Sequence, residues 1–105
     1  MSAEDYGFGG DAARRAFERL RREYLDEMPA RFTALEAAAA AGDDGALRTM
    51  LHQLAGSGGS HGFPAISTAA RQLERALAGS PTTEQRRAGL SALRLAVTEA
   101  REQLR

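Results

Sequence analysis

Residues 44–64 read DGALRTMLHQLAGSGGSHGFP, and this stretch decides the fold. Leu47, Leu51 and Leu54 recur at three- and four-residue spacing, the pattern of a helix with one buried face. The pattern ends in a glycine-rich run, and Pro64, a residue suited to the first turn of a helix, follows it. The stretch therefore predicts two successive helices joined by a turn.

Similar apolar stripes lie on both sides of this stretch. The stripe before it consists of Phe17, Leu20, Tyr24, Leu25, Met28, Phe32, Leu35 and Ala39. The two stripes after it consist of Ile66, Ala69, Ala70, Leu73 and Leu77, and of Leu90, Leu93, Val97, Ala100 and Leu104. Their spacing predicts helices that each bury one face. Pro29 interrupts the first stripe and leaves two possibilities open, one kinked helix or two helices that meet near Met28.

The predicted helix starts are marked by residues whose side chains can accept hydrogen bonds from the free N–H groups of the first turn. The candidates are Asp11 for the first helix, Asp43 or Asp44 for the helix through Leu51, and, for the last helix, Ser80 followed by Pro81 or Thr82 paired with Gln85. Gly42 suits the left-handed position that ends a helix.

Long helices with single apolar stripes and short connections bury those stripes by packing together antiparallel. Strand-favouring residues are nearly absent, since Ile66 and Val97 are the only isoleucine and valine. We therefore predict an all-α, antiparallel up-and-down four-helix bundle with a short N-terminal helical extension. The predicted bundle spans residues 11–105 and follows a flexible N-terminal arm over residues 1–10.

The composition excludes several classes of protein. The chain of 105 residues is long enough for one domain, and its 14 basic residues balance 14 acidic ones, so no net charge attracts it to nucleic acid or an anionic membrane. Cysteine is absent, which excludes disulfides, and no apolar stretch approaches the roughly 18 residues that cross a bilayer. We expect a cytoplasmic protein and, because every basic residue is arginine, a bacterial one.

His52 lies about 140° round its predicted helix from the leucine stripe, so its imidazole is expected to face solvent. Near neutral pH a free ring nitrogen of histidine is a nucleophile that can accept a phosphoryl group. Gly56 and Gly59 fall on the same side and leave bare backbone for a partner to approach. Arg48, one turn before His52, can hold a phosphoryl oxygen.

The string from His52 to Pro64, with Ala69-Ala70 and Leu73-Glu74 after it, resembles the histidine-containing phosphotransfer (HPt) family. The family's pattern is a histidine followed by x-Leu-Lys-Gly, a run of small residues, a glycine ten residues after the histidine, and a later Leu-Glu. The resemblance implies that His52 is the phosphoacceptor and that the exposed surface of its helix docks a receiver domain. The predicted binding residues are Arg48, Gln53, Ala55, Gly56 and Gly59.

The resemblance also implies which partners to expect. A response-regulator receiver domain is the expected partner, a hybrid histidine kinase is a second candidate, and Mg²⁺ is expected on the receiver and not on this chain. We expect a phosphoryl carrier without kinase activity, cofactor or bound metal. We further expect a monomer, because four helices can close their own core.

Ala55 stands where the family usually has lysine, three residues after the histidine. We expect Arg48 to substitute for that lysine in part. The alternative function is a helical interaction module that binds receiver or kinase domains without being phosphorylated. A third hypothesis, an enzyme that uses His52 as a general acid or base, is disfavoured because the sequence shows no second polar cluster that would form a pocket.

Three further features are interpreted as structural. His61 lies about half a turn round the helix from His52, so it is predicted to pack or to cap. Gly58, on the inner face, is predicted to permit close contact between helices. The arginine pairs at residues 14–15, 21–22 and 86–87 are interleaved with acids and are predicted to be solvated.

Overall fold

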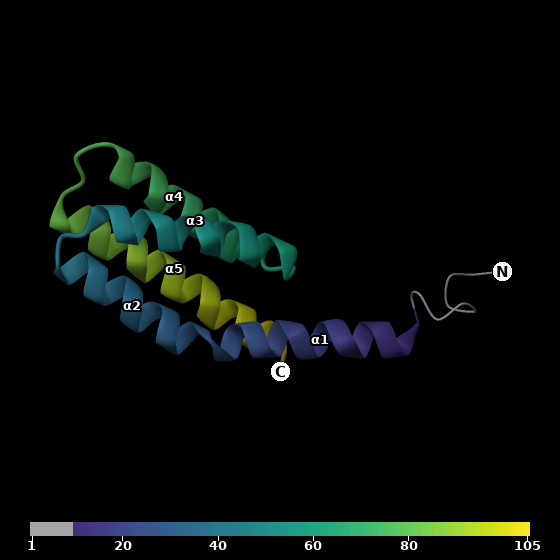
Figure 1. The fold of residues 1–105 in the computed structure, drawn as a ribbon. Coiled ribbons are helices and arrows are strands. Elements are labelled where there is room, and N and C mark those ends of the chain that lie inside the picture. Colours follow the sequence, from purple (N-terminus) through teal and green to yellow (C-terminus); the bar gives the residue numbers. More distant parts are fainter. Residues whose placement is uncertain (1–9) are drawn as a thin grey trace.

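The computed structural model describes residues 10–105, which form five α-helices. They are α1 (Asp11–Asp26), α2 (Met28–Ala40), α3 (Asp44–Ser60), α4 (Pro64–Ala78) and α5 (Thr83–Gln103). Helices α2 to α5 run up and down as an antiparallel bundle, and α1 extends from one end of it (Figure 1). The described residues contain no strand, so the predicted all-α fold with a helical extension is confirmed. Residues 1–9 of the predicted N-terminal arm lie outside the described residues.

The core consists of apolar side chains from all four helices of the bundle, joined by Tyr24 and Leu25 of α1 and by Phe63. On α3, Leu47, Leu51 and Leu54 are at most 1% exposed, as the stripe predicts. The predicted stripe of α4 is buried along its whole length, whereas that of α5 is only partly buried at its ends, Leu90 and Leu104. A helix with one fully buried face holds its opposite face, where His52 lies, in a fixed position.

The first stripe is buried only from Tyr24 onward. Phe17 and Leu20 are 43% and 53% exposed, so their predicted burial was wrong. The reason is the length of α1, which continues past the ends of the other helices, so that no helix faces its first half (Figure 1). Periodicity identifies the apolar face of a helix but not whether another element lies opposite it.

The sequence left open whether Pro29 kinks one helix or marks the meeting of two, and the structure shows two helices. Glu27 alone separates α1 from α2, and Pro29 stands in the first turn of α2. Proline is tolerated in a first turn because the N–H groups there have no partner within the helix. Glu27 keeps near-helical dihedral angles (φ −79°, ψ −15°), so α2 continues onward from α1 with a bend and does not fold back on it (Figure 1).

Two of the three predicted caps form as side-chain hydrogen bonds. Asp43 accepts a hydrogen bond from the backbone N–H of Ala46 at 3.0 Å, and Gly42 before it has the left-handed φ of +68° that suits glycine. At the start of α5, Thr82 and Gln85 form a reciprocal capping box. The backbone nitrogen of Gln85 lies 3.0 Å from Oγ1 of Thr82, and the backbone nitrogen of Thr82 lies 2.8 Å from Oε1 of Gln85.

Other predictions about polar residues were wrong. Asp11 is the first residue of α1 and not its cap, and the residue before it makes no side-chain cap. Arg21 is not simply solvated, because its Nε donates to the carbonyl of His61 at 3.0 Å. Arg86 donates two hydrogen bonds to Asp44, at 3.1 and 2.8 Å, and thereby holds the pKa of that carboxyl below its usual value. Alternation of charge indicates exposure but does not reveal which arginine meets another helix.

Gly58 lies where α3 packs on α4. A Cβ added there would be 3.1 Å from Cγ2 of Ile66 and 3.1 Å from the backbone nitrogen of Ser67. One of these neighbours is backbone and the other belongs to a fully buried side chain, so neither can move freely. The predicted role of Gly58 in close helix contact is confirmed.

Replacing Gly58 with alanine is expected to lower the free energy of unfolding by about 1–3 kcal/mol, because the added methyl group overpacks the contact with α4. Gly56→Ala on the same helix is the matched control, since an added Cβ there meets nothing within 4 Å. The control is expected to leave stability unchanged or to raise it by up to about 1 kcal/mol through helix propensity. Denaturant unfolding measures both changes, and equal effects would contradict the packing assigned to Gly58.

Candidate functional site

His52 projects from the solvent side of α3, opposite the buried leucines. Its side chain is 79% exposed, whereas the preceding Leu51 is completely buried. The predicted orientation of His52 is therefore confirmed. The imidazole is accessible to a partner, and the backbone that carries it is fixed by the core.

A carboxylate from the neighbouring helix orients the imidazole. Nδ1 of His52 lies 3.1 Å from Oε2 of Glu74 on α4. A carboxylate can only accept a hydrogen bond, so Nδ1 of a neutral imidazole carries the proton in this pair. Nε2 then has the free lone pair. The contact thus leaves Nε2 as the ring nitrogen of His52 with an available lone pair.

Glu74 is a residue of the candidate site that the sequence did not predict. In the sequence, Glu74 forms part of the Leu73-Glu74 match to the family pattern, but that match predicts no role for it. The two partners are separated by 22 residues along the chain, so only the packing of α4 on α3 brings them together. The available signal was its position after Leu73, a core residue, which places Glu74 at the edge of the interface between the helices.

Two shallow hollows flank the pair formed by His52 and Glu74. The first has a volume of about 440 Å³ and is lined, besides the pair, by Gly45, Arg48, Thr49 and Gln53. The second has a volume of about 280 Å³ and is lined, besides the pair, by Ala55, Gly56, Arg71 and Arg75. The structure thus gathers four of the five predicted binding residues around His52. Arg71 and Arg75 join them from α4 without having been predicted.

Gly59 and Ala55 differ from the other predicted binding residues. Gly59 is exposed, as expected, but lines neither hollow. Ala55 is only 4% exposed, and its carbonyl accepts a hydrogen bond of 2.6 Å from the hydroxyl of Ser67. Ala55 lines the second hollow, and its side chain offers no polar contact. Binding roles for all five predicted residues stay predictions.

His61 has the structural role predicted for it. Its ring stacks on Tyr24 with a centroid distance of 4.3 Å, and its Nδ1 lies 2.7 Å from the carbonyl of Ser57. The hydroxyl of Tyr24 is 2.8 Å from the hydroxyl of Ser57, and burial raises the pKa of Tyr24. These contacts attach α1 to the end of α3. They also leave His52 as the histidine that faces a partner.

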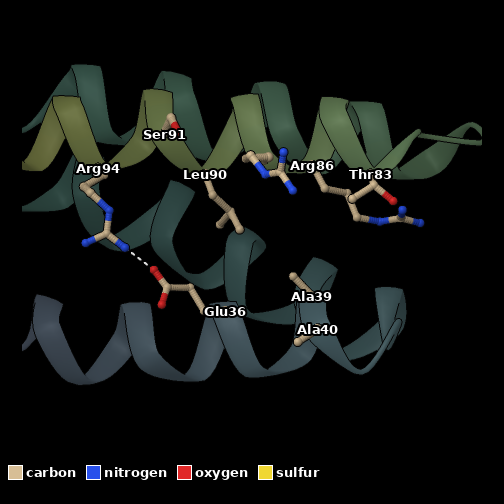
Figure 2. A pocket seen from close by; sticks show the side chains of 9 residues that line it. Glu36, Ala39, Ala40, Thr83, Arg86, Leu90, Ser91 and Arg94 are labelled. Atoms are coloured by element: carbon tan, nitrogen blue, oxygen red, sulfur yellow. Dashed lines mark hydrogen bonds and ion pairs between the residues drawn. The ribbon is translucent and has the colours of Figure 1, made fainter.

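A separate groove of about 320 Å³ lies between α2 and α5 and shares no lining residue with the hollows beside His52. Figure 2 shows Leu90 reaching from α5 toward α2 and an ion pair between Arg94 and Glu36 across the groove. The other two arginines that line it are also paired, Arg86 with Asp44 and Arg87 with Glu84. The groove therefore offers no arginine without a partner to an anion.

Residues 10–105 hold no group of three or more side chains suited to binding a metal ion. Within the same residues, none of the helices combines the length and the apolar character that a membrane span requires.

Comparison with protein families identifies the chain. The model of the Hpt domain family matches residues 19–103, a range that runs from within α1 to the end of α5 and includes both His52 and Glu74. Comparisons with curated proteins and with solved structures gave no match. Hpt domains are phosphotransfer modules of two-component signalling. Because the match covers well over half of the chain, this protein belongs to the Hpt domain family.

Proposed function

We propose that this chain is a phosphorelay carrier in which His52 accepts a phosphoryl group from a receiver-domain aspartate and transfers it to another receiver. The observation that carries the proposal is the contact between His52 and Glu74. It holds an exposed imidazole with Nδ1 engaged and Nε2 free, between two hollows that contain arginines. Phosphoryl transfer from an acyl phosphate requires a positioned nucleophile and cations for the phosphoryl oxygens.

The proposed step needs no external base. The lone pair of Nε2 forms the N–P bond while the bond between phosphorus and the aspartyl oxygen breaks, and its electron pair leaves with the aspartate carboxylate. Nδ1 keeps its proton, so the phosphorylated imidazole becomes cationic. The Glu74 carboxylate then faces a full positive charge and stabilises it. Transfer to the next receiver reverses these changes.

The receiver supplies the activated phosphoryl group, and Mg²⁺ is placed on the receiver in this proposal. The contribution of this chain is a rigid, correctly protonated nucleophile, which is why we propose a carrier and not an enzyme. We place the protein in the cytoplasm in this proposal. We propose a monomer, because helices α2 to α5 bury most of one another's apolar faces. A hybrid histidine kinase is proposed as the source of phosphate for the first receiver.

A second candidate function is an interaction module that binds a receiver or kinase domain without being phosphorylated. The small, buried Ala55 favours it, because the position where the resemblance expects lysine offers no cation. The two functions differ in what His52 does after a partner has docked.

Replacing His52 with glutamine is expected to abolish phosphorylation by a receiver charged with acetyl phosphate, because the only exposed nucleophilic imidazole is removed. His61→Gln is the control and is expected to keep the label, since His61 is engaged with Tyr24 and Ser57. Acid-labile radiolabel on each purified variant measures the outcome. Undiminished label on His52→Gln would contradict the proposal, and receiver binding by an unlabelled wild type would establish the interaction module.

Glu74→Ala is expected to slow phosphoryl transfer by about tenfold, at the low end of what loss of a histidine-orienting partner costs, because the pair is exposed. Glu74→Gln is expected to lie between that variant and the wild type, since its amide oxygen still accepts from Nδ1 but carries no charge. Glu23→Gln, an exposed acid on α1, controls for the loss of one negative charge. Rapid-quench transfer rates that are the same for all four proteins would remove Glu74 from the mechanism.

Arg48→Ala is expected to reduce the transfer rate by about fivefold, the size expected for one exposed, charge-assisted contact. The reason is that Arg48 shares the first hollow with His52 and contacts no acidic group among the described residues. The same rapid-quench assay measures the effect. A rate equal to that of the wild type would show that Arg48 does not substitute for the family lysine.

A further inference from the structure

The arginines beside His52 differ from most others in the described chain. Most arginines elsewhere pair with acids or donate to backbone carbonyls, as do Arg86 with Asp44 and Arg101 with the carbonyl of Leu25. Arg71 and Arg75 make no ion pair, hydrogen bond or ring contact with any residue in 10–105. Both are exposed. Their guanidinium groups are available to a ligand.

These two arginines share one hollow with the imidazole. Arg71 precedes Glu74 by one turn on the same face of α4, and Arg75 follows it directly. Gly56 also lines the hollow, and an added Cβ there would meet nothing within 4 Å, so the space above it is open. An incoming group can therefore lie beside the imidazole of His52 and within the reach of two cationic side chains.

The charges that line this hollow favour a dianion. Glu74 is its single acidic residue, and that carboxylate is already engaged with Nδ1 of His52. The two positive charges of Arg71 and Arg75 exceed the single negative charge of Glu74. A phosphoryl group on Nε2 would otherwise be repelled by the nearby carboxylate, and two guanidinium groups offset that repulsion by forked hydrogen bonds to the phosphoryl oxygens. The groove between α2 and α5 cannot bind a dianion in this way, because each arginine that lines it is already paired with an acidic side chain.

We propose that Arg71 and Arg75 form a clamp that binds the phosphoryl group while it is attached to His52. This inference rests on the proposed carrier function and adds to it the groups that set how strongly the phosphate is held. The clamp acts on the phosphorylated state more than on the free protein, since only that state has a dianion in the hollow. It therefore shifts the transfer equilibrium toward the carrier and lengthens the lifetime of phosphohistidine.

The double variant Arg71→Gln/Arg75→Gln tests the clamp. The matched control is Arg15→Gln/Arg19→Gln, which removes the same charge from exposed positions on α1 that line neither hollow beside His52. Each protein is mixed with a radiolabelled phosphoreceiver, and the partition of label at equilibrium is measured. The lifetime of the isolated phosphoprotein is measured without a receiver. The clamp variant is expected to shift the partition about tenfold toward the receiver and to lose label faster, whereas the control matches the wild type.

The outcomes separate the clamp from the function on which it rests. Absence of label on wild-type His52 would refute the carrier function and the clamp with it. A labelled wild type with the same partition and lifetime as Arg71→Gln/Arg75→Gln would refute the clamp alone. A slower loading rate with unchanged partition and lifetime would assign the arginines to receiver docking and would also overturn the clamp.

Discussion

Two helices hold a histidine and a carboxylate 3.1 Å apart only when their backbones approach closely and in one register. Gly58 permits the approach, because its missing side chain leaves room for Ile66 and for the backbone of Ser67. The hydroxyl of Ser67 fixes the register through its buried hydrogen bond to the carbonyl of Ala55. Ser67 and Glu74 are about two turns apart on α4, so the same helix face that packs against Gly58 presents the carboxylate to His52.

This packing lets an exposed nucleophile behave as part of a rigid frame. Even an ion pair between exposed side chains contributes only about 0–1 kcal/mol to stability, so the hydrogen bond from the neutral imidazole of His52 to Glu74 does not hold the bundle together. Instead, the contact depends on the bundle, because the buried leucines of α3 and the apolar stripe of α4 position these two surface side chains. Small residues near the site keep the imidazole uncovered, and the cations come from both helices, Arg48 from α3 and Arg71 and Arg75 from α4. The surface of α3 and α4 therefore presents a preformed arrangement of imidazole, carboxylate and arginines.

Periodicity along one helix was sufficient to predict the helices and the solvent-facing side of α3. It also predicted that His52 and Arg48 lie on the same face and that His61 has a structural role. These features depend on spacing within a single element. The contact with Glu74 and the placement of Arg71 and Arg75 depend on the register between two helices, which no pattern in one of them encodes. The same dependence on neighbouring helices explains why the burial of Phe17 and the solvation of Arg86 were predicted wrongly. In the first case the expected neighbouring helix is missing, and in the second an unexpected acid from α3 is present.

The central claim is that Glu74 holds the proton on Nδ1 of His52 and leaves Nε2 to take the phosphoryl group. The most direct test is nitrogen-15 NMR of the histidine side chains, recorded before and after phosphorylation by a charged receiver domain. The account predicts the Nδ1–H tautomer for His52 in the free protein and coupling of phosphorus to Nε2 in the phosphorylated one. A proton on Nε2 in the free protein, or phosphorus bound to Nδ1, would contradict it.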